Sequence, residues 1–230
     1  MKDACEILVV DSFSTDNTLE VCREYGARIL QHEYTGPAKQ KNWAVGQCSQ
    51  KWVLQMDADE VLGPGLWSEI QAAVRTAPDD LHAFRIPRKN HYLGEWVRHG
   101  GFYPDYQIRL FRTDFGRWRD REVHEHIHVP GIIGTLTCPI VHEGMPTLSK
   151  QLANLDRYTL YEAHERRKNN RRFRLGDLVL RSPLVFIHRY VWLQGFRDGI
   201  RGLILSGYTA FYVFLSYAKL WEMEARNPKS

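Results

Sequence analysis

Short apolar runs alternate with amphipathic segments along the first third of the chain. Three runs are rich in β-branched and apolar residues and are short enough to be buried strands; they lie at residues 6–10, 27–30 and 52–56. Three further segments are bounded by polar, glycine or proline residues and have the pattern of helices; they lie at residues 17–25, 39–47 and 66–75. This alternation predicts an α/β domain in which parallel strands are joined by crossover helices.

The pattern changes after residue 83. Residues 83–142 are rich in glycine, proline, tryptophan, histidine and arginine, and their candidate strands are short, at residues 83–87, 107–112 and 137–141. Irregular segments of this kind are where an α/β enzyme carries an acceptor site. From residue 148 to the end the pattern is helical. We therefore expect a catalytic domain over residues 1–147 and a helical region over residues 148–230.

Composition excludes some classes of protein. The 230 residues suffice for a compact domain with a sizeable core, and 43% hydrophobic and 25% charged residues are ordinary for a globular protein. A net charge of +4 is too small to indicate a nucleic-acid partner. The first residues lack the basic-then-apolar pattern of a signal peptide, and the four cysteines are scattered without a CxxC pair. The four cysteines are therefore expected to be free thiols in a reducing cytoplasm.

Acidic residues follow two of the predicted parallel strands. Asp11 comes after one strand, and Asp57 and Asp59 come after another. Ligands of open α/β sheets bind outside the carboxyl ends of the strands, so we expect both groups to face one crevice. Two carboxylates separated by one residue can also offer oxygens to Mg²⁺ or Mn²⁺ at a diphosphate. A solvated acidic turn explains that pair equally well when it is taken alone.

Three segments together resemble the family 2 glycosyltransferases. Residues 9–18 read VVDSFSTDNT, residues 39–44 read KQKNWA and residues 55–60 read QMDADE, in the order and spacing of that family's motifs. Three later segments are similar to the branch that includes bacterial lipopolysaccharide core glucosyltransferases. They are GGFYPDYQIRLFR at 100–112, VHE at 123–125 and GFRDG at 195–199. The resemblance therefore covers nearly the whole chain.

The resemblance implies a fold and an activity. It implies a GT-A-type, Rossmann-like α/β fold with a mostly parallel sheet flanked by helices, followed by a helical, membrane-associating region. It implies inverting transfer of a sugar, a hexose such as glucose, from a UDP-sugar to a lipid-linked or lipopolysaccharide core acceptor in cell-envelope glycan synthesis. Such an enzyme would be cytoplasmic and peripherally associated with the inner face of the cytoplasmic membrane.

The same resemblance implies roles for residues on the donor side. Asp11 would meet the uracil or the ribose of the donor, with Ser14 on the same turn. Lys41 would lie near the nucleotide, although a solvated helix lysine is an equal alternative. Asp57 would face the ribose or the donor sugar.

A divalent metal is implied as well. Asp59 would hold Mg²⁺ or Mn²⁺ on the diphosphate of the donor. His142, which follows a predicted strand, would be a further metal ligand or else a structural histidine.

Inverting transfer requires a base that accepts the proton of the attacking hydroxyl group. Asp105 matches the acidic residue of the family's acceptor motif and is the first candidate. Glu125, between two histidines, is the second. The alternation of His124, His126 and His128 is that of a strand, and no HExxH zinc helix is present.

The C-terminal third suggests a membrane surface. Residues 166–174 carry six positive charges in nine residues, residues 184–192 are apolar and aromatic, and residues 202–218 are uncharged. The uncharged stretch is at the lower edge of the length that spans a bilayer, about 20 residues. We expect two helices that lie in the interface with the basic run on anionic lipid. A spanning helix and burial against the catalytic domain are the alternatives.

Two other functions fit parts of the sequence. In a haloacid-dehalogenase-like phosphohydrolase, Asp57 would be phosphorylated and Asp59 would be the acid and base. That motif normally opens its domain, and this reading leaves the Asp11 turn unexplained. A non-catalytic protein that binds a membrane surface is the second alternative.

The chain begins where the family's second strand is expected. Family members start with a strand and a helix that are absent before residue 6. The absent strand would lie centrally, between the strands that end at Asp11 and Asp57. Each buried, unpaired backbone group costs about 1–3 kcal/mol. We therefore expect the catalytic domain to be incomplete at its N-terminus and the chain to be inactive or poorly folded alone.

Overall fold

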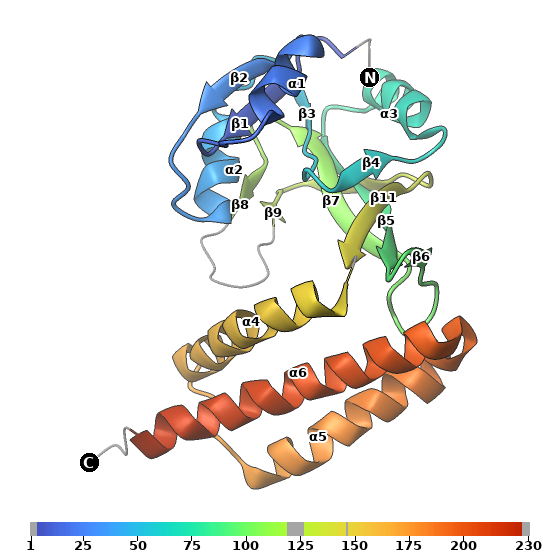
Figure 1. Ribbon diagram of the computed structural model, residues 1–230. Helices are drawn as coiled ribbons and strands as arrows, with labels where there is room; N and C mark the ends of the chain where they lie inside the picture. The colour runs from blue at the N-terminus through green and yellow to red at the C-terminus, as the bar shows by residue number, and fades with distance from the viewer. Residues whose placement is uncertain (1–3, 119–126, 146, 227–230) are drawn as a thin grey trace. The chain divides into compact units, whose positions relative to one another are not determined.

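The computed structural model describes residues 4–118, 127–145 and 147–226 (Figure 1). The first elements in chain order are β1 (Leu8–Asp11), α1 (Thr18–Glu24), β2 (Arg28–Gln31), α2 (Pro37–Val45), β3 (Trp52–Leu54), β4 (Glu60–Leu62) and α3 (Leu66–Thr76). The middle of the chain forms β5 (Leu81–Tyr92), β6 (Glu95–Trp96), β7 (Asp105–Arg112), β8 (Arg117–Trp118), β9 (Ile127–His128), β10 (Ile132–Thr135) and β11 (Ile140–Met145). The last elements are α4 (Leu148–Lys168), α5 (Leu175–Ile187), the π-helical turn η1 (His188–Trp192), the 3₁₀ turn η2 (Gly195–Asp198) and α6 (Gly199–Arg226).

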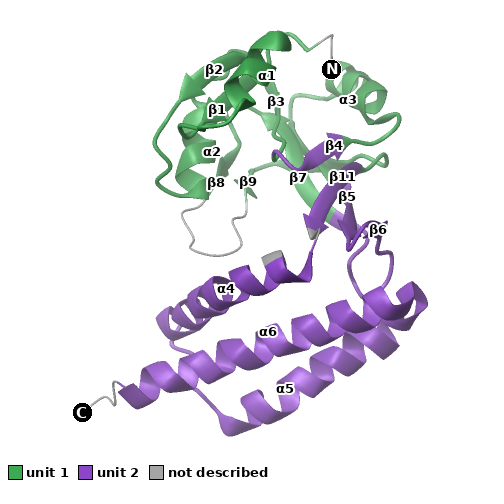
Figure 2. Ribbon diagram, viewed as in Figure 1, with its two compact units in different colours: residues 1–57, 62–86, 106–139 green, residues 58–61, 87–105, 140–230 purple. Residues whose placement is uncertain are grey.

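The chain forms two compact units (Figure 2). Unit 1 contains residues 1–57, 62–86 and 106–139. Unit 2 contains residues 58–61, 87–105 and 140–230. Each unit is therefore built from three separate pieces of sequence, and β5 gives its first half to unit 1 and its second half to unit 2.

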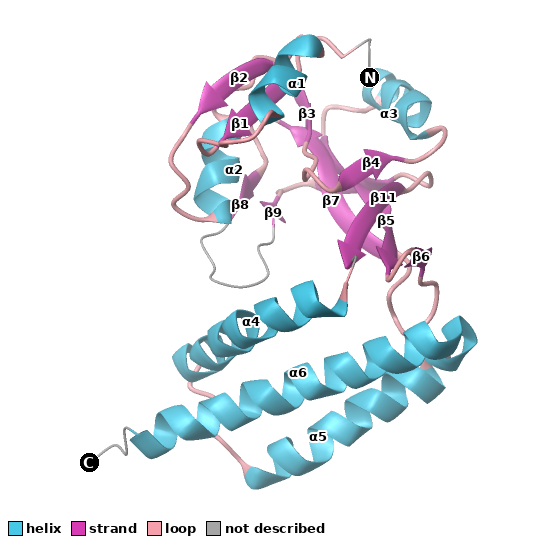
Figure 3. Ribbon diagram, in the orientation of Figure 1, coloured by secondary structure: helices cyan, strands magenta, loops and turns pink. Residues whose placement is uncertain are grey.

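Strands and helices alternate in unit 1, as the apolar pattern predicts (Figure 3). β1 and β2 pair in parallel, with Asp11 opposite Gln31, and α1 is their crossover helix. β3 differs from the expectation of a parallel series, because it pairs antiparallel with β7, with Val53 opposite Phe111. Burial favours this partner, because Phe111 is fully buried near the end of β7 and Val53 of β3 packs against the same core cluster. The α/β class is confirmed; β1 and β2 form a two-stranded parallel sheet of their own, and the sheet that contains β3 and β7 is mixed.

The core of unit 1 forms around an aromatic pair. Phe111 and Trp118 meet edge to face with their ring centroids 5.5 Å apart, and Ala38 and Val45 of α2 join them. A Cβ atom on Gly116 would lie 2.2 Å from the Phe111 ring, so this turn requires glycine.

α2 is fixed to this core by one side chain. Asn42 Nδ2 donates to the Trp118 carbonyl at 2.8 Å, and Asn42 Oδ1 accepts from the Trp118 amide at 2.9 Å. Both backbone groups of Trp118 are thus satisfied by one amide. The asparagine of the KxxNxA segment therefore attaches its helix to the core of unit 1.

Unit 2 combines the second half of β5, β6 and β11 with the helices expected after residue 148. β11 pairs in parallel with the second half of β5, so that His142 lies opposite Asn90. β5 and β6 form a hairpin through Leu93 and Gly94, which both have positive φ, as a two-residue turn of this type requires. A Cβ atom on Gly202 would lie 1.8 Å from the Gly195 carbonyl oxygen, so only glycine permits the close approach of α6 to η2.

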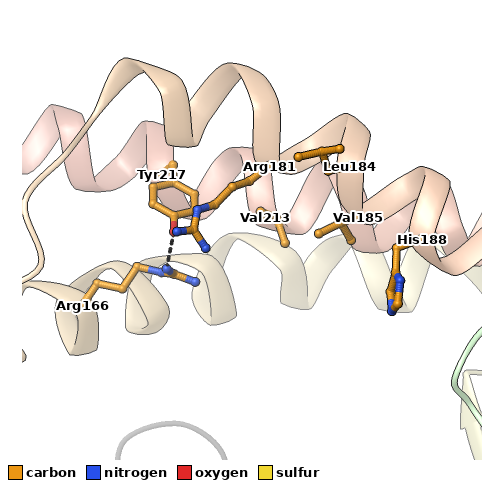
Figure 4. A pocket seen from close by; sticks show the side chains of 7 residues that line it. All are labelled: Arg166, Arg181, Leu184, Val185, His188, Val213 and Tyr217. Carbon is orange, nitrogen blue, oxygen red and sulfur yellow. Dashed lines mark hydrogen bonds between the residues drawn. The ribbon is translucent and has the colours of Figure 1, made fainter.

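One tyrosine joins the three long helices of unit 2. Figure 4 shows Tyr217 of α6 between Arg166 of α4 and Arg181 of α5. Arg166 Nη1 donates to the Tyr217 hydroxyl at 2.8 Å, and both guanidinium groups lie over the ring, at 4.4 and 5.6 Å from its centroid. Glu162 and Asp177 neutralise the two arginines from one turn away on their own helices. These contacts hold α4, α5 and α6 together.

Candidate active site

The first expected donor residue lies in a tight turn at the end of β1. Asp11 is buried, and its carboxylate accepts hydrogen bonds from the Ser14 amide at 3.1 and 3.2 Å. Gln31 Nε2 donates to Asp11 Oδ2 at 3.1 Å. These hydrogen bonds from Ser14 and Gln31 lower the pKa of Asp11. Asp11 and Ser14 are therefore brought together around an ionised carboxylate.

α2 reaches both acidic strand ends of unit 1. Gln40 Nε2 donates to Ser12 Oγ, next to Asp11, at 3.1 Å. The following residue, Lys41, places its Nζ atom 3.6 Å from Asp57 Oδ1. Two consecutive residues of one helix thus link the end of β1 to the segment after β3.

Asp57 is held by a buried arginine. Arg109 Nη2 donates to Asp57 Oδ2 at 2.6 Å, and Gln55 Nε2 donates to Asp57 Oδ1 at 2.9 Å. Burial raises the pKa of Asp57, but the positive charges of Arg109 and Lys41 outweigh it, so the pKa is lowered. Arg109 itself is buried and hydrogen-bonds Gln55 as well. Asp57 is therefore ionised and fixed in place.

The lowered pKa of Asp57 predicts a pH-dependent effect of Asp57→Asn on stability. A carboxylate with a depressed pKa stabilises the folded state above the pKa of an unfolded aspartate, about 3.9. That contribution is lost as the pH falls through the lower pKa of the folded state. Thermal unfolding should show Asp57→Asn less stable than the wild type at pH 7, with the difference shrinking below about pH 5. A stability difference between Asp57→Asn and the wild type that stays the same as the pH falls well below about 5 would contradict this account. Asp114→Asn, at an exposed position, is the matched control.

A second cluster lies in unit 2 and contains the expected metal ligands. His142 Nε2 lies 3.5 Å from Asp59 Oδ2, and His142 Nδ1 lies 2.7 Å from Asn90 Oδ1. An amide oxygen only accepts, so His142 donates from Nδ1 and keeps the lone pair of Nε2 on the side of Asp59. A histidine nitrogen and a carboxylate oxygen in this arrangement suit a divalent cation. Among the described residues no group of three or more histidine, cysteine, aspartate or glutamate side chains forms a fuller site.

The first candidate base is in the same cluster. Arg88 donates to Asp105 Oδ2 from Nε at 2.9 Å and from Nη2 at 2.7 Å. Asn90 Nδ2 donates to the same oxygen at 3.1 Å. Arg88 Nη1 also lies 3.5 Å from Glu60, whose side chain is fully buried. These three hydrogen bonds to Oδ2 orient the Asp105 carboxylate. Glu125, the second candidate base, lies outside the described residues.

Arg88 and Asn90 have places in this site that the sequence motifs do not indicate. Asn90 is 2% exposed and touches both Asp105 and His142. Arg88, Asn90 and Tyr92 alternate along β5, which places them on one face of the strand. Residues 88–92 read RKNHY, so no alternation of polar and apolar residues distinguishes this face in the sequence.

Comparisons with known proteins identify relatives of this chain. The family model described as glycosyl transferase family 2 matches residues 1–134. The lipopolysaccharide core biosynthesis glycosyltransferase LpsC of Rhizobium meliloti (strain 1021) is 28% identical over 232 residues, which cover 98% of this chain and 86% of LpsC. A glycosyltransferase of Rickettsia bellii (strain RML369-C) is 40% identical over 242 residues, covering 98% of this chain and 80% of its own. The crystal structure of S. aureus TarS 1-349 in complex with UDP is 15% identical, with a TM-score of 0.43, and covers 97% of this chain and 82% of that one.

The protein is thus a glycosyltransferase with an α/β fold of GT-A type. More specifically, the chain belongs to glycosyl transferase family 2, and it is related over nearly its whole length to a lipopolysaccharide core biosynthesis enzyme. The assignment of Asp57 and Asp59 to a phosphohydrolase is not retained, because both residues lie inside the matched family region.

Proposed function

We propose that this glycosyltransferase moves a hexose such as glucose, with inversion, from a UDP-sugar to a lipid-linked or lipopolysaccharide core acceptor in cell-envelope glycan synthesis. The observation that carries the proposal is the position of Asn90. Its amide hydrogen-bonds both Asp105, the candidate base, and His142, the candidate metal ligand. One buried side chain therefore fixes the group that would activate the acceptor and the group that would stabilise the leaving diphosphate.

The donor residues have complementary roles in this proposal. Asp11 and Ser14 would bind the nucleoside, and Lys41 and Asp57 would contact the ribose or the donor sugar. The ionised state of Asp11 and Asp57 suits hydrogen bonds from ribose hydroxyl groups or from the uracil ring.

Asp59 and His142 would hold Mg²⁺ or Mn²⁺ on the diphosphate. The metal would supply positive charge to the departing UDP. The hydrogen bond from His142 Nδ1 to Asn90 sets the tautomer that such a ligand needs, and the Glu143 amide fixes the Asp59 backbone through a hydrogen bond at 3.1 Å.

Asp105 would act as the base. Its carboxylate takes the proton of the acceptor hydroxyl as that oxygen forms a bond to the anomeric carbon from the face opposite UDP. The bond between the anomeric carbon and the diphosphate oxygen breaks, and its electron pair leaves with UDP. Arg88 and Asn90 both donate to Asp105 Oδ2, which orients the carboxylate for this step.

The acceptor class and the location are linked. The relative LpsC is named as a lipopolysaccharide core biosynthesis glycosyltransferase, which supports the proposal of a lipopolysaccharide core acceptor for this chain. In this chain residues 195–226 form a helical segment that is long and apolar enough to cross a membrane by length and composition, and 28% of its most apolar stretch is buried. We propose that the enzyme acts as a peripheral protein at the inner face of the cytoplasmic membrane, where a lipid-linked acceptor and the cytoplasmic donor would meet.

A nucleotide-sugar screen tests the proposed function. Thermal unfolding should shift upward with UDP and UDP-hexoses when Mn²⁺ or Mg²⁺ is present, and less without metal, because a ligand that binds only the folded state stabilises it. GDP- and CDP-sugars are the matched controls. UDP release in the presence of lipopolysaccharide core acceptors should then identify the sugar. Binding of UDP-sugars without any turnover would overturn the proposal in favour of a non-catalytic binding protein.

A further inference from the structure

The turn between η1 and α6 holds the loop that precedes Asp105. Asp198 Oδ2 accepts hydrogen bonds from the Arg98 amide at 3.2 Å and the His99 amide at 2.7 Å. Asp198 Oδ1 lies 2.9 Å from His99 Nδ1. The Asp198 side chain is only 10% exposed. The carboxylate of Asp198, in the GFRDG segment, therefore holds the backbone amides of residues 98 and 99.

Further contacts from the same turn fix the next two residues of the loop. Arg189 Nη1 donates to the Gly100 carbonyl at 2.7 Å, and the Gly100 amide donates to the Leu193 carbonyl at 2.8 Å. Gly101 has a φ of +77°, and a Cβ atom on it would lie 2.9 Å from the Leu193 side chain. The double glycine of the GGFYPD segment is what lets the loop approach the turn this closely.

The Asn90 side chain connects the loop to Asp105. The Phe102 carbonyl accepts from Asn90 Nδ2 at 3.4 Å, and the same amide group donates to Asp105. Val97, 1% exposed, packs in a shared core with Leu205 of α6. All of these contacts lie within unit 2. The turn, the loop and the candidate base therefore form one connected framework.

The outer side of the same turn is apolar and exposed. Trp192 is 80% exposed, Phe196 50% and Ile200 63%. Exposed apolar residues continue from the turn along both neighbouring helices. They are Leu184, Ile187 and Val191 towards α5, and Leu203, Phe211 and Phe214 along α6. Their spacing of three, four or eight residues forms one stripe per helix. An apolar surface of this extent on a folded protein marks an interaction site.

Charge identifies the partner of this surface. Five basic residues are exposed at the end of α4 and in the turn that leads directly into α5; they are Arg167, Lys168, Arg171, Arg172 and Arg174. These basic residues lie just before the start of α5, whereas the turn of residues 191–200 follows the end of that helix, and exposed apolar residues of α5 lie along the helix between them. Basic residues at one end of an exposed apolar helix complement the anionic headgroups and acyl chains of a bilayer surface. A lipid surface satisfies both the charge and the apolar stripes.

We propose that the turn of residues 191–200 docks on an anionic lipid surface and thereby orders the acceptor loop of residues 98–101 for catalysis. Trp192 and Phe196 enter the interface, while Asp198 and Arg189 hold the loop from the other side of the turn. Asp198 is a positioning residue that acts through the loop. The inference rests on the proposed function only in assigning that loop to the acceptor.

Hydrogen exchange tests the inference without requiring activity. Vesicles of phosphatidylcholine with phosphatidylglycerol should bind the full chain, with binding weakened by salt, and should slow exchange of the amides of residues 98–100 by about tenfold. Trp192→Ser combined with Phe196→Ser should lose both effects. Tyr25→Ser, which removes a side chain that is 76% exposed in unit 1, should keep both. Vesicle binding that leaves these amides unchanged in the wild type would overturn the coupling.

Asp198→Asn separates docking from positioning. The variant should bind vesicles as the wild type does and should lose the slowed exchange of the loop. With a UDP-hexose and acceptor its kcat should fall by about 10–100-fold with the KM for the donor unchanged, the usual cost of losing a supporting contact. Arg189→Lys provides an independent test of the same loop if Asp198→Asn does not fold. Equal vesicle binding by the Trp192 and Phe196 variant, or dimerisation by light scattering without vesicle binding, would refute the lipid assignment. An absence of transfer by the wild type would count against the proposed function alone.

Discussion

Asp105→Asn should lower kcat by about 10²–10⁴-fold, the usual contribution of a general base, while the affinity for the UDP-sugar is unchanged. Asparagine keeps an oxygen that accepts from Arg88 and Asn90, so the geometry around the side chain is preserved. It cannot take up the proton of the acceptor hydroxyl. Steady-state kinetics with a fixed acceptor, together with UDP binding by calorimetry, separates these two effects.

The design of this test follows from the contacts of Asp105. Arg88 also lies beside the buried Glu60, so a loss of the Asp105 charge leaves Arg88 with a remaining partner. The melting temperature of the variant should therefore stay close to that of the wild type. Asp114→Asn, at an exposed position, is the control for the same chemical change. If Glu125→Gln shows the loss of kcat and Asp105→Asn does not, the role of base belongs to Glu125.

Asp59→Asn should abolish metal-dependent binding of UDP and reduce transfer at least about 10²-fold, because a bound metal supplies several kcal/mol at the leaving diphosphate. His142→Gln should have the same sign and a smaller effect, since the carboxylate brings a charge and the imidazole does not. Titration of UDP with and without Mn²⁺ measures both variants. Glu143→Gln, which changes the neighbouring exposed carboxylate that lies 2.7 Å from His91, is the matched control. UDP affinity in Asp59→Asn that still depends on metal would remove Asp59 from the site.

Elements with a local signal could be predicted from the sequence. α1, α2 and α3 lie within a few residues of the predicted helices; Asp11 is the last residue of β1, and Asp57 and Asp59 follow β3. β5 is longer than predicted, because its apolar pattern stops at Pro87, where strands commonly end. Pro87 is tolerated because β10 pairs with residues 81–85 and β11 with residues 88–92, so the missing amide falls between two partner strands.

The parts of the site that the sequence does not reveal depend on distant partners. Asn90 meets Asp105 across 15 residues and His142 across 52, and Arg88 meets Asp105 across 17. No periodicity or short motif encodes such pairs. Asp11 and Ser14, by contrast, are three residues apart and interact within one turn. Local hydrogen bonds are thus predictable here, whereas the contacts that fix the candidate base emerge only when the strands pair.

The division of unit 2 into separate pieces of sequence has a consequence for how these enzymes diversify. The acceptor loop belongs to residues 87–105, whereas the groups that hold it, Asp198 and Arg189, belong to residues 140–230. A recombination event with a single crossover between these two pieces would take the loop from one parent and Asp198 and Arg189 from the other. The loop and the residues that hold it would then come from different proteins. Chimeras among relatives that exchange acceptor preference therefore require both pieces from the same parent, and residues 106–139 of unit 1 can come from the other.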